Sequence, residues 1–199
     1  MAKLYFKYGV MGSSKTANAL IAKFDYEEDG SKVLLIKPST DTRDGDNVVK
    51  SRIESLHSTE AMILKPEDEL AISSISDYDV IICDESQFFT PKQIERFKHI
   101  AVYCNVPVMC YGLLTDFQTN LFPGSKRLIE LADSLQEIKK MCKCKKKATV
   151  NARLVNGRIT QDGEQVMIGG NESYKAMCYE CWNNTLLLQE IEVMNGLEV

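Results

Sequence analysis

The segment Tyr8–Leu20 (YGVMGSSKTANAL) carries most of the residue types of a phosphate-binding loop. Gly9, Lys15 and Thr16 occupy three positions that the pattern requires, but Ser14 stands where it has a second glycine. In such a loop, backbone N–H groups converge on phosphate oxygens at a helix N-terminus, the lysine adds positive charge, and the hydroxyl can bind Mg²⁺. The segment therefore predicts a phosphate site, although an imperfect match alone is equally compatible with a chance turn before a helix.

A second reactive group is the acidic pair Asp84 and Glu85, which follows the apolar run VIIC. If that run is a buried parallel strand, the pair lies at its carboxyl end, where open α/β sheets bind ligands. One carboxylate can orient Mg²⁺ and its waters, and the other can accept a proton from an incoming nucleophile. A solvated pair at a strand end is the alternative. Together with the upstream loop, the pair favours a nucleoside triphosphate site.

The cysteines are a third chemical feature, because four of the seven form two close pairs in polar surroundings. These are Cys142, Cys144, Cys178 and Cys181. The other three, Cys83, Cys104 and Cys110, lie in or beside apolar runs, where a reduced thiol packs as a small hydrophobic group. The odd total argues against a disulfide scaffold. In a reducing compartment the two pairs predict one tetrahedral Zn²⁺ bound by four thiolates, with free thiols as the alternative.

The elements that position these groups alternate along the first two thirds of the chain. Strand-like apolar runs lie at residues 4–8, 32–37, 79–85 and 106–112. Helical patterns lie at residues 15–29, 90–104 and 124–137. The apolar side of the first helix is expected to carry Leu20, Ile21 and Phe24. This rhythm predicts a parallel sheet, connected by right-handed crossovers and covered by helices on its faces.

The composition changes from about Lys139 onward to lysine, cysteine and short turn-rich segments. Residues 153–174 resemble two short strands joined by a long loop, with glycines as breakers. We therefore predict a nucleotide-binding α/β domain at residues 1–138 and a small metal-binding domain at residues 139–199.

The overall composition is that of a soluble globular protein, with 44% hydrophobic and 26% charged residues. No apolar run approaches the roughly 18 residues of a membrane-spanning helix, and the N-terminus lacks the apolar core of a secretory signal. We expect a cytoplasmic protein with no membrane partner. The formal charge of −4 argues against a surface devoted to nucleic acid.

Five segments, in this order, resemble motifs of the type II thymidine kinases, the small zinc-containing kind found in bacteria and animals. They are YGVMGSSKT at the phosphate loop, KPSTDTR at residues 37–43 with SR at 51–52, DESQFF at 84–89, YGLLTDFQTNLF at 111–122 and GEQVMIGGNESYKAMCYEC at 163–181. The resemblance covers nearly the whole chain. It implies a P-loop NTPase-type parallel sheet with helices on both faces, and a small zinc-binding domain that carries a lasso loop. It also implies transfer of the γ-phosphoryl group of ATP to the 5′-hydroxyl of thymidine or deoxyuridine, in pyrimidine salvage.

The resemblance implies roles for residues of an ATP site. Glu85 would be the general base, and Lys15 would hold the β- and γ-phosphates. Thr16 would bind Mg²⁺, and Asp84 would hold the water shell of the metal. Arg43 would offset charge that develops during transfer. The implied ATP-binding residues are Gly9, Val10, Met11, Gly12, Ser13, Ser14, Lys15, Thr16, Asp41, Arg43, Asp84 and Gln87.

The nucleoside would be held by the lasso near residues 163–174, whose backbone groups would bind the pyrimidine edge. Tyr174 would contact the sugar or the loop, and apolar side chains would form the walls of the base pocket. The implied substrate residues are Met11, Phe88, Leu113, Phe117, Phe122, Gln165, Val166, Met167, Ile168, Gly169 and Tyr174. Without the resemblance, ordinary core packing is the simpler interpretation of the apolar residues.

Two features depart from the usual family pattern. Ser14 replaces a glycine, and Cys142 and Cys144 are separated by a single residue, a spacing that resembles a bacterial branch of the family. The resemblance further implies a homotetramer and inhibition by thymidine triphosphate.

Two other classes of protein remain open. The lysine-rich run at 139–147 (KKMCKCKKK) is compatible with a nucleic-acid-dependent ATPase that carries a basic zinc knuckle. No aromatic residues interleave with these lysines, so we favour a solvated face and expect no nucleic-acid partner. A catalytically impaired nucleoside-binding relative is supported by Ser14 alone and opposed by the retained lysine, threonine and acidic pair.

Overall fold

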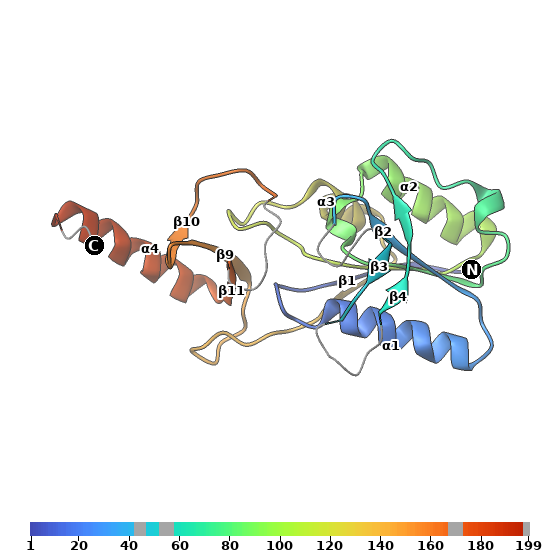
Figure 1. The fold of residues 1–199 in the computed structure, drawn as a ribbon, viewed down its shortest axis with the longest axis horizontal. Coiled ribbons are helices and arrows are strands. Elements are labelled where there is room, and N and C mark those ends of the chain that lie inside the picture. Colours follow the sequence, from blue (N-terminus) through green and yellow to red (C-terminus); the bar gives the residue numbers. More distant parts are fainter. Residues whose placement is uncertain (42–46, 52–57, 167–172, 197–199) are drawn as a thin grey trace. The chain divides into compact units, whose positions relative to one another are not determined.

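The computed structural model describes residues 1–41, 47–51, 58–166 and 173–196 (Figure 1). The chain divides into two compact units. The first, called the sheet unit, comprises Met1–Gly9, Ser14–Leu114 and Leu121–Ile138. The second, called the cysteine unit, comprises Val10–Ser13, Thr115–Asn120 and Lys139–Val199. The cysteine unit therefore includes two short segments from the first part of the sequence.

The sheet unit is built on six parallel strands in the order β5-β2-β6-β7-β1-β8. Their bounds are β1 (Leu4–Tyr8), β2 (Val33–Pro38), β5 (Met62–Leu64), β6 (Val80–Cys83), β7 (Val108–Gly112) and β8 (Ser134–Glu137). A short antiparallel ribbon is formed by β3 (Val48–Val49) and β4 (Thr59–Glu60). Strands β2, β6 and β7 are buried along their whole length, as expected where both faces of a parallel sheet are covered. The predicted parallel sheet is confirmed.

Helices cover both faces of this sheet, with α1 on one face and α2 and α3 on the other (Figure 1). Their bounds are α1 (Lys15–Glu28), α2 (Pro91–His99) and α3 (Pro123–Leu131), with short helical turns η1 (Ile72–Ser74), η2 (Ser86–Phe88) and η3 (Ile100–Cys104). On one face Phe97 of α2 packs in the same core as Phe6 of β1, and on the other Leu20 of α1 shares a core with Ile82 of β6. The apolar residues of alternate strand positions thus form two separate cores.

Two details of the helix predictions are wrong. Helix α1 buries alanines and Leu20, whereas Ile21 and Phe24 are 46% and 58% exposed. Residues 134–137 do not continue helix α3 but form the edge strand β8, which pairs with β1. Main-chain pairing with a distant strand overrides the local helical pattern there.

The cysteine unit contains a three-stranded antiparallel sheet in the order β10-β9-β11 and one long helix. The bounds are β9 (Val150–Val155), β10 (Arg158–Thr160), β11 (Tyr174–Met177) and α4 (Tyr179–Met194). Asn156 and Gly157 join β9 to β10 with φ of 50° and 78°, the conformation that a two-residue hairpin turn requires. The prediction of two strands joined by a long loop missed this hairpin.

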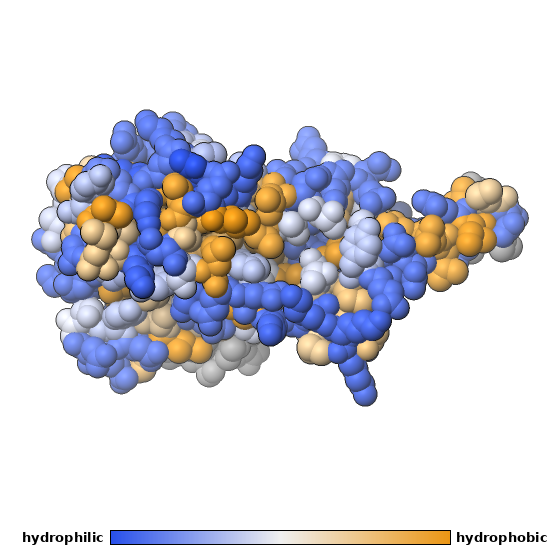
Figure 2. All heavy atoms as spheres, turned by 180° about the vertical axis from the view of Figure 1, so that it is seen from behind, coloured by the Kyte–Doolittle hydropathy of each residue, from blue (hydrophilic) through white to orange (hydrophobic). Residues whose placement is uncertain are grey.

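The core of the cysteine unit packs Val150, Ala152 and Trp182 against Cys142 and Cys178. Beyond this core, the C-terminal half of α4 carries exposed apolar side chains (Figure 2). None of the helices among the described residues combines the length and apolar character needed to cross a membrane.

Candidate active site and metal centre

The phosphate-loop segment joins strand β1 to helix α1, as the sequence predicts. In the cysteine unit, the backbone N–H of Met11 donates to Asn151 Oδ1 at 2.7 Å, and Lys140 Nζ donates to the Met11 carbonyl at 3.2 Å. Gly12 has a φ of 67°, and a Cβ there would lie 2.5 Å from Lys140 Nζ. Sequence reasoning missed Lys140 and Asn151, because neither belongs to a phosphate-loop pattern. The flanking residues Val10 and Ser13 are buried.

Ser14 adopts the left-handed conformation, with φ of 63° and ψ of 28°, which a glycine accepts at no steric cost. Its side chain is exposed, and it makes no capping hydrogen bond to helix α1. Its carbonyl accepts hydrogen bonds from the backbone N–H and the Nδ2 of Asn18, at 3.0 and 2.7 Å. The serine therefore adopts a conformation that glycine accepts without strain, and these two hydrogen bonds stabilise it.

Lys15, Thr16 and Asp84 come together in the sheet unit. The Thr16 side chain is hydrogen bonded to the Asp84 carboxylate, and the charge of the buried Lys15 acts on the same carboxylate. Burial, followed by repulsion from Glu85, raises the pKa of Asp84 to about 7, while Thr16 and Lys15 oppose the rise. A buried carboxylate beside a hydroxyl is a donor set that suits Mg²⁺, and a cation there would favour the ionised carboxylate.

Glu85 is held in a left-handed backbone conformation, with φ of 47° and ψ of 41°. Its carboxylate accepts a hydrogen bond of 2.6 Å from Gln87 Nε2, and Gln87 Oε1 accepts one of 2.9 Å from the Leu113 N–H. Gln87 is buried, so both ends of its amide are fixed by the sheet unit. An unfavourable backbone conformation that the surrounding contacts enforce is typical of residues at functional sites.

Two glycines allow the chain to pack closely around residues 86–89, which follow Glu85. A Cβ on Gly112 would lie 2.5 Å from Ser86 Oγ, and a Cβ on Gly124 would lie 2.5 Å from the Phe89 carbonyl. Neither glycine was singled out from the sequence, since only the tertiary contact gives it a role.

Asp41 is buried, with Lys37 Nζ 4.0 Å from its carboxylate. Lys37 is also buried, and it donates to the Val48 carbonyl at 2.9 Å. Arg43, the predicted partner of Asp41 at the phosphate chain, lies outside the described residues, as does Arg52.

The predicted apolar substrate residues lie in different units. In the sheet unit, Phe88 and Phe122 form an edge-to-face pair with ring centroids 5.7 Å apart, and Leu113 is buried. Met11 and Phe117 belong to the cysteine unit, where Phe117 is buried.

The predicted lasso residues that the structure describes are Gln165, Val166 and Tyr174; Met167, Ile168 and Gly169 lie outside it. Gln165 Nε2 donates to Asp116 Oδ2 at 2.8 Å. The Tyr174 hydroxyl accepts hydrogen bonds from the guanidinium of Arg153 on strand β9. Sequence reasoning missed Asp116 and Arg153. Asp116 lies inside the motif YGLLTDFQTNLF and could have been found there, whereas no local signal marks Arg153.

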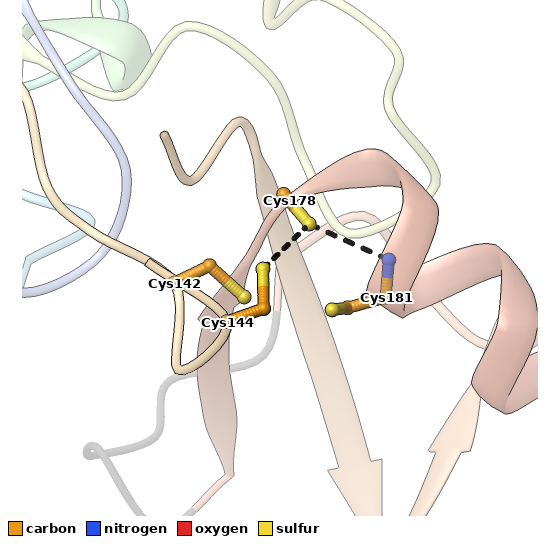
Figure 3. A group of neighbouring side chains, drawn as sticks. All are labelled: Cys142, Cys144, Cys178 and Cys181. Atoms are coloured by element: carbon orange, nitrogen blue, oxygen red, sulfur yellow. Dashed lines mark hydrogen bonds between the residues drawn. The ribbon is translucent and has the colours of Figure 1, made fainter. Parts of the chain in front are cut away.

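The four cysteines of the two pairs meet in the cysteine unit, and their sulfur atoms all lie within 4.8 Å of one another (Figure 3). Cys144 Sγ and Cys178 Sγ are 3.5 Å apart. Tetrahedral Zn²⁺ with Zn–S distances of about 2.3 Å requires sulfur separations of about 3.8 Å. The cluster is therefore compatible with a structural zinc site.

The pKa values of two of these thiols shift in opposite directions. Burial raises the pKa of Cys142, but hydrogen bonds from Cys144 and Cys178 outweigh it and lower the value to about 6. Hydrogen bonds with Cys144 and Cys178, followed by burial, raise the pKa of Cys181 to about 12. Several thiolates cannot coexist at this spacing without a positive charge, which a bound metal provides.

A parallel sheet with a phosphate-loop segment after its first strand and an acidic pair at the end of β6 defines a nucleotide-binding enzyme of the P-loop type. A family model described as thymidine kinase matches residues 2–182. The chain belongs to the thymidine kinase family and is an enzyme of that ATP-dependent class.

Bacterial relatives match over nearly their whole length. A thymidine kinase of Streptococcus pyogenes serotype M3 is 42% identical over 189 residues, which cover 92% of this chain and 98% of that protein. Thymidine kinases of Lactococcus lactis and Legionella pneumophila are 42% and 40% identical, covering 89% of this chain and 95% and 88% of those proteins. The Pif1 helicase structure from Candida albicans aligns with a TM-score of 0.39 and 14% identity, over 70% of this chain and 36% of that chain. That similarity is too low to favour the alternative of a nucleic-acid-dependent ATPase.

Proposed function

We propose that this protein transfers the γ-phosphoryl group of ATP to the 5′-hydroxyl of thymidine, and of deoxyuridine, to form the 5′-monophosphate in pyrimidine salvage. The observation that carries the proposal is the meeting of Lys15, Thr16 and the buried Asp84 at the end of β6, with Glu85 directly beyond. Phosphoryl transfer needs chiefly positioning and electrostatic stabilisation, and these residue types supply both.

Each residue has a defined part in this reaction. Lys15 holds the β- and γ-phosphates with its ammonium group, and the backbone N–H groups at the start of α1 bind phosphate oxygens. Thr16 and Asp84 would hold Mg²⁺ and its waters, and a bound Mg²⁺ would supply positive charge that offsets the charge of the phosphates. Asp41 and Arg43 flank the phosphate chain.

Glu85 accepts the proton of the 5′-hydroxyl as that oxygen attacks phosphorus. Gln87 positions the carboxylate through the 2.6 Å hydrogen bond, and is itself fixed by the Leu113 N–H. Because Gln87 cannot turn away without losing that second bond, the carboxylate of Glu85 is held in one orientation.

The nucleoside is bound by the substrate residues that the family resemblance implies, with backbone groups of the lasso contacting the pyrimidine edge. Backbone amides and carbonyls distinguish donors from acceptors, and aromatic rings supply flat apolar faces. From the family resemblance we further propose a cytoplasmic homotetramer that thymidine triphosphate inhibits.

The test is turnover of labelled thymidine by purified protein with Mg²⁺ and ATP. We expect labelled thymidine monophosphate, and its absence at any workable enzyme concentration would refute the proposal.

Replacing Glu85 by Gln keeps the length of the side chain and the same backbone strain. We expect Glu85→Gln to leave ATP affinity nearly unchanged and to lower kcat by about a hundredfold or more. Glu28→Gln at the exposed end of α1 is the matched control. Equal rates for Glu85→Gln and the control would remove Glu85 as the base.

A further inference from the structure

Arg153 is a buried cation that no motif in the sequence explains. It lies on β9, the central strand of the cysteine unit, and is only 3% exposed. Burying a guanidinium away from water is costly unless its N–H groups are hydrogen bonded. The hydrogen-bond partners of Arg153 therefore indicate its role.

Those partners lie at two separate places in the sequence. Arg153 Nη1 donates to the Glu164 carbonyl at 2.7 Å, and Nη2 donates to the Gln165 carbonyl at 3.2 Å. Nε and Nη2 both donate to the Tyr174 hydroxyl, at 3.0 and 2.7 Å. Tyr174 is also the residue directly opposite Arg153 in the β9–β11 pairing. One planar fork thus links residues 164–165 to the start of β11.

The same guanidinium stacks on an aromatic ring of a third segment. Its central carbon lies 3.6 Å from the ring centroid of Phe117, which is also buried. The neighbour of Phe117 in the sequence is Asp116. Its Oδ1 accepts hydrogen bonds of 2.9 Å from the backbone N–H groups of Gln118 and Asn120. Its Oδ2 accepts a hydrogen bond from Gln165 Nε2. Gln165 is therefore held twice, by Arg153 through its carbonyl and by Asp116 through its side chain.

The contacts of Arg153 with Phe117, Glu164, Gln165 and Tyr174 are called the arginine clamp. The backbone conformation of Gly163 is a separate observation that supports this clamp. Its φ of 115° is one that residues with a Cβ rarely adopt, and a Cβ there would lie 3.3 Å from Arg153 Nη1. The glycine both turns the chain toward residue 164 and leaves room for the guanidinium.

We propose that Arg153 is a positioning residue for the nucleoside, because it fixes Phe117, Gln165 and Tyr174 relative to one another. This inference rests on the proposed function, which assigns those three residues to the nucleoside. Lysine cannot replace the arginine, because an ammonium group offers neither the planar stacking face nor donors in a fork. The role concerns thymidine alone, since three of the four residues that Arg153 contacts are predicted nucleoside residues and none is the ATP residue Lys15, Thr16 or Asp84. The three are Phe117, Gln165 and Tyr174, and the fourth is Glu164.

The experiment compares Arg153→Lys with Arg158→Lys, a matched control whose side chain on the neighbouring strand β10 is 41% exposed. We expect Arg153→Lys to raise the KM for thymidine about tenfold or more, with the KM for ATP and the zinc content unchanged. The control should leave all three unchanged. Tyr174→Phe removes the shared hydroxyl, and its effect should be much smaller in the Arg153→Lys background than in the wild type.

Hydrogen exchange without nucleoside tests the clamp separately from the activity. We expect faster exchange in Arg153→Lys at residues 164–166 and 173–177 than in the wild type or the control. Unchanged exchange together with an unchanged KM for thymidine would overturn the proposal, and so would a parallel rise of both KM values with loss of zinc. If exchange is slower in the wild type than in Arg153→Lys, but the wild type does not phosphorylate thymidine, the proposed function is refuted and the clamp is not.

Discussion

The left-handed backbone of Ser14 gives the most direct test of how this phosphate loop departs from its pattern. A residue with a Cβ pays about 1–2 kcal/mol for this conformation, and glycine avoids that cost. Glycine in turn adds conformational entropy to the unfolded chain, which costs about 0.5–1 kcal/mol. Ser14→Gly should therefore raise the free energy of unfolding by about 0.5–1 kcal/mol. For a chain of this size the unfolding midpoint should rise by about 1–4 °C.

Differential scanning calorimetry without ligand measures this change. The matched control is Ser31→Gly, because Ser31 is a serine whose φ is outside the left-handed region. There the substitution brings only the entropic cost, so the midpoint should fall. An equal fall in both variants would refute the account of Ser14, since it would mean that the serine carries no conformational cost.

The same variant tests whether the serine impairs the enzyme. Because Ser14 already adopts the left-handed conformation and its side chain is exposed, we expect ATP binding to leave the strain unchanged. A cost that is equal in the two states cancels, so kcat and the KM for ATP should change by less than about threefold. A gain in rate well beyond that range would show that the serine obstructs phosphate binding, and would support a catalytically impaired protein.

Three further outcomes are expected. Cys144→Ser should abolish zinc binding and lower the thermal stability, and a chelator should have the same effects on the wild type. The control Cys104→Ser should retain the metal. Zinc retained in Cys144→Ser would contradict a four-thiolate site. Gly124→Ala should destabilise the protein by about 1–3 kcal/mol in a denaturant titration although alanine favours helix, since the Cβ would meet backbone 2.5 Å away, while the exposed Lys126→Ala should be neutral. Burial tends to raise the pKa of Asp133, but hydrogen bonds from Lys98 and a backbone N–H lower it, so Asp133→Asn should cost about 1 kcal/mol at pH 7. Because this stabilisation is lost as the pH falls through the lowered pKa, the two proteins should converge below about pH 4, and a constant difference down to pH 3 would exclude the charge as its cause.

The sequence by itself determined the features that depend on local spacing. The phosphate-loop segment, the acidic pair after an apolar run and the two cysteine pairs are all readable from neighbouring residues, because each pattern lies within one strand end, turn or helix start. The alternation of apolar runs and helical patterns likewise predicted a parallel sheet with helices on both faces. The five motifs, in the order found in the family, further indicated the activity, which the composition alone does not indicate.

Only the tertiary structure decided how those groups are held. The local patterns do not contain the left-handed conformations of Ser14 and Glu85, and Gln87 is fixed beside Glu85 by the N–H of Leu113, which is distant in the sequence. Strand β8 was predicted as helix because its pairing with β1 is likewise long-range. Arg153 has no local signal at all, since its role follows from which residues β9 and β11 bring opposite each other. Local spacing encodes periodicity, whereas register and backbone strain are set by the packing of the whole chain.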